Sequence, residues 1–373
     1  MKIIKIIAVS FLLFAALTVT ASAESNKEEI YKKQYEAGGA DKLEENLSED
    51  TKELLKRLEI NAEEYSSLKA PDFKEMLEII LECVTEGVKK PLEISASVLG
   101  IILLFSLLNT AFSVSDTGGN EIFLVLVIGT VLLSPLTQLI SATSAVLKTL
   151  AAFLNIFIPV FGGILSASGH INLGTTVSAG FIGAGQLMLQ FVSLVLVPSA
   201  KAVACLTLCG SMSGISGINN FCKFIKNLIL SLFGTVSAIF LSVLSMQTGL
   251  AASADSTLLR TSKSVISSLI PVMGPLISET IGTAGGCLGV LRTGIGVYGV
   301  LALFLTALPI LISLLAYKFF IGFLMGVGHI FDMSRPVSVL NSASFCIDIL
   351  IGALVFTLLI FIISIGVISK AGV

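Results

Sequence analysis

Residues 147–174, LKTLAAFLNIFIPVFGGILSASGHINLG, are matched without a gap by residues 259–286, LRTSKSVISSLIPVMGPLISETIGTAGG. The two segments share eight identities over 28 positions, and Lys148 in the first corresponds to Arg260 in the second. Duplicated units with proline and glycine inside apolar segments are a common construction of transport proteins. The match therefore predicts an internal repeat, with coincidence in a chain rich in Gly, Ala and Leu as the alternative.

The composition predicts a polytopic membrane protein. Hydrophobic residues make up 54% of the 373 residues and charged residues only 13%, whereas soluble domains carry roughly a quarter charged residues. Residues 24–91 hold 18 of the 25 acidic residues and 11 of the 23 basic residues. Because nucleic-acid binding requires a clustered basic face, which this chain lacks, no nucleic acid is expected as a partner.

The first 23 residues have the pattern of a secretory signal peptide. Lys2 and Lys5 precede an apolar stretch, and Ala21-Ser22-Ala23 forms a cleavage site of small residues. An uncleaved first anchor is the alternative. In both cases residues 24–91 lie outside the cytoplasm.

The acidic residues 24–91 are expected to form a small exported helical segment. Asp50 and Glu53 have the spacing of a capping box, which predicts that a helix begins there. Pro71 has the place of a first-turn proline for a second helix, whose apolar stripe begins at Phe73. Such a stripe is typical of the packing face of a small helical domain, and docking onto a partner is the alternative.

The remaining residues, 92–373, are expected to form an all-α polytopic membrane domain with six spans, because a spanning helix needs about 20 apolar residues. The spans are residues 94–114, 122–140, 176–197, 228–250, 295–315 and 344–368. The duplication groups them into repeat units over about 120–201 and 228–318, followed by the final span.

Residues 153–165 and 265–277 contain the prolines of the repeat and are shorter than a span. Re-entrant segments have about 10–14 residues, so we expect two broken hairpins; if these segments cross instead, the topology changes. With the N-terminal segment exported, the positive-inside rule then puts Lys148 and Arg260 on the outer side. The inner side collects Lys201, Lys223, Lys226, Lys318 and Arg335.

Two matched Ile-Pro-Val-x-Gly segments are the first candidates for a functional site. A proline inside an apolar helix frees a backbone carbonyl that hydrocarbon cannot satisfy. Pro159 with Gly162, and Pro271 with Gly274, therefore predict an interior lined by protein and a polar pathway at mid-membrane depth. A simple packing kink is the alternative.

Charged residues at membrane depth are the second set of candidates, because such charges are costly and are usually paired or functional. Glu279 and Arg292 flank the second proline segment, and they are expected to form a pair between two helices or a site that selects ions or cargo. Asp348 begins the last span and is expected to pair with Arg335 or Lys318.

The chain has few residues suited to catalysis. His170 and His329 are the only histidines, and neither lies in an HExxH or GxSxG motif. Cys205 and Cys209 are one helical turn apart but have no accompanying His or acidic pair for a metal. No Walker lysine follows the glycine-rich stretches. The sequence therefore predicts no enzyme, no metal and no cofactor.

Three short stretches give the sequence a family resemblance. Leu259–Lys263 (LRTSK), Ile270–Gly274 (IPVMG) and Leu291–Gly296 (LRTGIG) resemble the signature region of the stage III sporulation protein AE family. The resemblance extends over roughly residues 94–370. The chain is also similar to the family in having a signal peptide, an acidic helical segment and a multi-span body.

The resemblance implies a membrane component of a sporulation-specific channel or transport complex between mother cell and forespore. Its expected place is the mother-cell membrane around the forespore, with residues 24–91 outside the cytoplasm. The implied partners are the other subunits of that complex and membrane lipid, and a homo-oligomer is compatible with it. The alternatives are a stand-alone secondary transporter of a small solute and a non-conducting membrane scaffold.

Overall fold

The computed structural model describes residues 47–60, 73–112, 117–167, 190–213, 217–269 and 274–370, with isolated positions between them. All elements in these ranges are helices, which confirms the predicted all-α class. They are α3 (Glu49–Arg57), α4 (Phe73–Phe112), α5 (Thr117–Ala167), a π-helical turn η3 (Val192–Leu196), α7 (Val197–Ser213), α8 (Gly217–Leu269), α9 (Gly274–Ile330) and α10 (Ser334–Lys370). The predicted signal peptide, residues 1–23, lies outside the described residues.

Five of the described helices contain a stretch long and apolar enough to cross a membrane, in agreement with a polytopic protein. They are α4, α5, α8, α9 and α10, and they contain most or all of the predicted spans 94–114, 122–140, 228–250, 295–315 and 344–368. The predicted span 176–197 lies largely outside the described residues. The helices are longer than predicted: α9 has 57 residues, which is about 85 Å at about 1.5 Å per residue.

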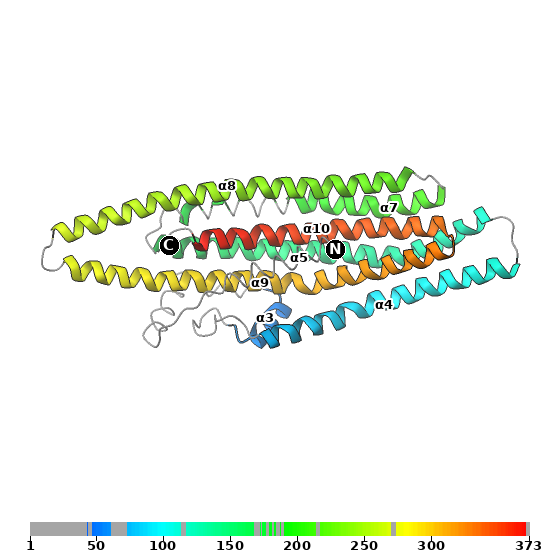
Figure 1. Cartoon of the computed structure of the whole chain (residues 1–373), viewed down its shortest axis with the longest axis horizontal. Helices are drawn as coiled ribbons and strands as arrows, with labels where there is room; N and C mark the ends of the chain where they lie inside the picture. Colours follow the sequence, from blue (N-terminus) through cyan, green and yellow to red (C-terminus); the bar gives the residue numbers. More distant parts are fainter. Residues whose placement is uncertain are drawn as a thin grey trace.

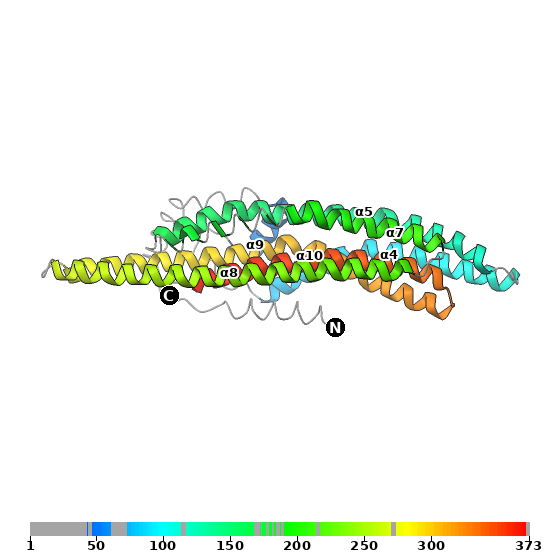
Figure 2. The ribbon, with the colours of Figure 1, turned by 90° about the horizontal axis from the view of Figure 1, so that it is seen from above.

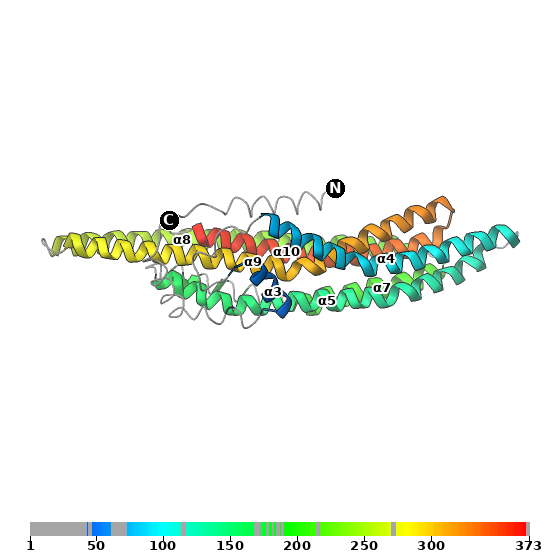
Figure 3. The ribbon, with the colours of Figure 1, turned by 90° about the horizontal axis from the view of Figure 1, so that it is seen from below.

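The long helices lie side by side along one axis and form an elongated bundle (Figures 1 and 2). α10 lies at the centre, where it contacts α5, α7, α8 and α9. α4 covers α9 on the side that carries α3 (Figure 3). The apolar segments of α9 and α10 are mostly buried, whereas that of α8 is mostly exposed. The core of the bundle is therefore built around α9 and α10.

The first predicted re-entrant hairpin does not form. α5 continues as one helix through residues 153–165, with Pro135 and Pro159 inside it. The side chain of Pro159 is on the exposed side of α5, so its ring does not disturb the packed face. One missing helix hydrogen bond does not end a helix whose apolar face is otherwise well buried.

The corresponding segment of the second copy differs from the first. α8 ends at Leu269 and α9 begins at Gly274, and Pro271 between them lies outside the described residues. The described residues of 265–277 thus belong to the ends of two long antiparallel helices (Figure 1). Pro275 sits in the first turn of α9, where proline is favoured, whereas the first copy has Gly163 at the matching position. The second proline explains why a helix begins in one copy only.

The predicted exported segment and the predicted membrane domain are joined by a continuous helix. α4 runs through Pro91, so the predicted boundary near residue 91 falls inside a helix. α3 begins two residues earlier than the Asp50 capping box predicted, because the Ser48 hydroxyl accepts a hydrogen bond from the Thr51 amide at 3.3 Å. Serine is a preferred N-cap because its side chain satisfies a free amide of the first turn.

Candidate functional site

The described core contains a cluster of three charged side chains from three helices. Asp348 of α10 lies between two lysines: its Oδ1 is 2.9 Å from Nζ of Lys318 in α9, and its Oδ2 is 3.2 Å from Nζ of Lys226 in α8. The Lys318 ammonium also donates to the hydroxyl of Ser344. The Lys226 ammonium lies 4.7 Å from the centre of the Phe345 ring. We call Lys226, Lys318, Ser344 and Asp348 the charge cluster.

The charge cluster is mostly shielded from the surroundings of the bundle. The exposed fractions of the side chains are 17% for Lys226, 32% for Lys318 and 14% for Asp348. Removing charges from water costs several kcal/mol per ion unless they are paired. One carboxylate accompanies two ammonium groups, so the cluster carries a net charge of +1 when all three groups are ionised.

Of the two partners expected for Asp348, the structure has Lys318 and not Arg335. The Arg335 Nε is instead 3.7 Å from Oε2 of Glu121, where α10 begins beside the start of α5. Lys226 was missed as a partner, although the sequence contained a signal for it. Its spacing from the buried Cys222, Ile229 and Phe233 places it on the packed face of α8.

The Pro159–Gly162 segment does not line a polar cavity in the described residues. Phe153, Phe157 and Phe161 stack along the buried face of α5, with ring centres 5.7 and 5.3 Å apart. A Cβ placed on Gly299 of α9 would lie 2.4 Å from the Phe157 ring, so α5 and α9 approach closely here. Aromatic rings fill the space in which a pathway was predicted.

Glu279 and Arg292 were expected to pair between two helices, but both lie in α9. They are thirteen positions apart, which is about 20 Å along a helix. Their side chains lie outside the described part of the structure, so the pair stays a prediction. Gly274 is the first residue of α9, and Pro271 lies outside the described residues.

Helix α3, which belongs to the segment predicted to be exported, packs on α9. The Thr51 hydroxyl lies 3.2 Å from the Thr306 hydroxyl of α9, and Leu55 and Leu58 of the same segment are buried. Arg57 forms an ion pair of 2.6 Å with Glu82 of α4, and this hydrogen bond raises the pKa of the guanidinium. α3 therefore packs against the bundle and does not form a separate domain.

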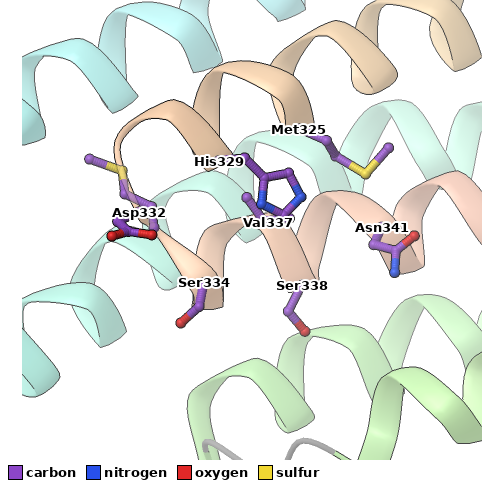
Figure 4. A pocket seen from close by; sticks show the side chains of 8 residues that line it. Met325, His329, Asp332, Ser334, Val337, Ser338 and Asn341 are labelled. Atoms are coloured by element: carbon purple, nitrogen blue, oxygen red, sulfur yellow. The ribbon is translucent and has the colours of Figure 1, made fainter.

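A pocket of about 410 Å³ lies at the turn between α9 and α10 (Figure 4). Its lining consists of Met325, His329, Asp332, Met333, Ser334, Val337, Ser338 and Asn341. The His329 carbonyl accepts a hydrogen bond from the Asp332 amide, and Asp332 adopts a φ of 56° in the turn. The backbone carbonyl of His329 thus takes part in the turn that ends α9. No group of three metal-ligating side chains occurs among the described residues.

These features define an all-α membrane protein of long packed helices. The model of the family "Stage III sporulation protein AE" matches residues 53–372, and the chain belongs to this family. The stage III sporulation protein AE of Bacillus subtilis (strain 168) is 25% identical over 278 residues, which cover 72% of this chain and 68% of the relative. No solved structure matches the chain.

Proposed function

We propose that this protein is an integral membrane component of a sporulation-specific channel or transport complex between mother cell and forespore. The single observation that carries the proposal is the family match over residues 53–372, which includes all five apolar helices. On this proposal the chain lies in the mother-cell membrane around the forespore, with residues 24–91 outside the cytoplasm, and it is not an enzyme.

The packing of the core favours a component over a stand-alone transporter. A transporter of this class holds its substrate near the bilayer midplane, at the interface between its repeats. In the described part of the chain, the face of α5 at the repeat is filled by Phe153, Phe157 and Phe161. Any passage would then run between chains, with other subunits or further copies of this protein supplying the remaining wall.

Complementation in sporulating cells tests the proposal. Deletion of the gene is expected to stop forespore development at a late stage, and the wild-type gene is expected to restore it. A fluorescent fusion should appear in the membrane around the forespore. A normal yield of spores from the deletion strain, or a fusion confined to the forespore interior, contradicts the proposal.

A reconstitution experiment separates the component from the alternatives. The purified chain in liposomes is expected to transport no small solute alone, because its described interior is packed. Solute uptake by the chain alone supports the transporter. If the protein restores spore formation although no small molecules pass between the two cells, the result supports the scaffold.

A further inference from the structure

The charge cluster has an excess of positive charge at a place where it is hard to neutralise. Lys226 and Lys318 contact the same carboxylate, Asp348. Among the described residues, two other acids lie near the start of α10: Glu121, which pairs with Arg335, and Asp332 in the turn before the helix. No ion pair between either acid and Lys226 or Lys318 occurs among the described residues. A buried charge without a counter-charge is strongly destabilising. The cluster as it stands therefore lacks one negative charge.

Within the part of the chain that the structure describes, the donors of the charge cluster are not all used. Each ammonium group carries three N–H donors. Lys226 directs one to Asp348 and faces the Phe345 ring, and Lys318 directs one to Asp348 and one to Ser344. The Ser344 hydroxyl accepts from Lys318, which leaves its own hydrogen to donate. Two ammonium groups and a hydroxyl thus offer donors around one carboxylate.

The charge cluster extends from the buried interior towards the surface of the bundle. Ser344 is 2% exposed, whereas the Lys318 side chain is 32% exposed. We propose that Lys226, Lys318 and Ser344 form a binding site for one small monovalent anion beside Asp348. A charge of −1 balances the cluster, and the same chemistry would also fit the phosphate of an anionic lipid headgroup. The site does not depend on the proposed function.

The experiment uses the full chain in detergent and chloride as the probe. Chloride replaces gluconate, an anion too large for the site, at constant potassium concentration, and the midpoint of thermal unfolding, Tm, is measured. Binding to the folded state alone raises Tm in a saturable way. We expect a shift of a few degrees for the wild-type chain. A Tm that is independent of chloride overturns the proposal.

Variants locate the effect. K226M leaves one lysine for one carboxylate and is expected to lose the chloride response, while K223M, which changes an exposed lysine three residues away on α8, is expected to keep it. D348N raises the excess charge to +2 and should reach half of its response at lower chloride. Equal responses in K226M and the wild type contradict the site.

A second measurement keeps the test decisive if K226M fails to fold. The line width of the chloride nuclear resonance reports exchange with a bound site, and bromide in excess should narrow it in the wild-type chain. K318Q provides an independent neutral variant in which this competition should be lost. Nanodiscs distinguish the source of the anion: stabilisation by phosphatidylglycerol over phosphatidylcholine without any chloride response assigns the site to lipid and overturns the small-anion proposal.

Discussion

At the scale of single residues, the structure depends on a few contacts that cannot be exchanged for similar ones. Asp348 is the common partner of Lys226 and Lys318, so its removal affects three helices, whereas each lysine affects two. Gly299 has a comparable importance for packing, because the Phe157 ring occupies the space that a larger side chain would need.

Replacing Asp348 should destabilise the protein more than replacing Lys226. D348N leaves two ammonium groups without a carboxylate, and breaking a buried ion pair in this way costs about 3–5 kcal/mol. K226M leaves the Lys318–Asp348 pair intact and should cost about 1 kcal/mol or less, as for weakly coupled pairs. Denaturant unfolding in detergent measures both. Equal losses of stability in D348N and K226M would mean that the Asp348 carboxylate stabilises the protein only through its contact with Lys226.

Adding one methyl group at Gly299 should separate α5 from α9. G299A forces the new Cβ against the Phe157 ring, and overpacking of this kind costs about 1–3 kcal/mol. G322A is the matched control in the same helix, since nothing lies within 4 Å of its Cβ position. Alanine is a better helix former than glycine, so G322A should be neutral or slightly stabilising. If both variants unfold at the same point, the close approach is not important for stability.

At the scale of elements, the existence of the helices could be predicted but their ends could not. Apolar residues predicted the spans 228–250 and 344–368, which lie inside α8 and α10. The same hydrophobic pattern fits a hairpin and a continuous helix, so Pro159 alone could not decide between them. The two copies differ at Pro275, which lies in the first turn of α9, and Gly163, which lies inside α5. Whether a proline ends a helix depends on how much apolar surface that helix buries.

The candidate site was predictable only in part, because its residues are far apart in the sequence. Asp348 was recognised because a carboxylate inside an apolar span is unusual. Its pairing with Lys226 was not predicted, because the two residues are 122 positions apart and meet only when α8 packs on α10. Glu279 and Arg292 were expected to lie in two helices, because no signal in the sequence showed that one helix contains both.

The contact between α3 and α9 should protect α3 from proteolysis. L55D places a charge at a position that is 4% exposed and should release α3 from the bundle. Trypsin should then cut after the neighbouring Lys56 or Arg57 at least several times faster than in the wild-type chain. E53Q, at an exposed position of the same helix, is the control and should be cut at the wild-type rate. Unchanged cleavage of L55D would show that α3 is held elsewhere.

At the scale of the whole molecule, α8 runs along most of the bundle from its left end in Figure 1. Lys223 and Arg260 lie in this helix and are separated by 37 residues, about 55 Å at the rise of a helix. A hydrocarbon layer is about 30 Å thick. If α8 crosses it, the two residues lie on opposite sides.

Thiol labelling should show this arrangement directly. In a background in which all six native cysteines are replaced by serine, R260C should react with a membrane-impermeant reagent added outside intact cells. K223C should react only after the membrane is permeabilised, as the positive-inside rule predicts. Labelling in lysed cells controls for burial of the thiol. Reaction of both positions from the same side would mean that α8 does not cross the membrane.

The length of α9 has a consequence for the space around the bilayer. A helix of 57 residues that is tilted by the usual 20° buries about 32 Å of its length in lipid tails, which is less than half. The remaining length of α9 must contact water or neighbouring polypeptide. If the protein lies between two membranes, as proposed, the part of α9 outside the lipid sets a lower limit on how closely those membranes can approach.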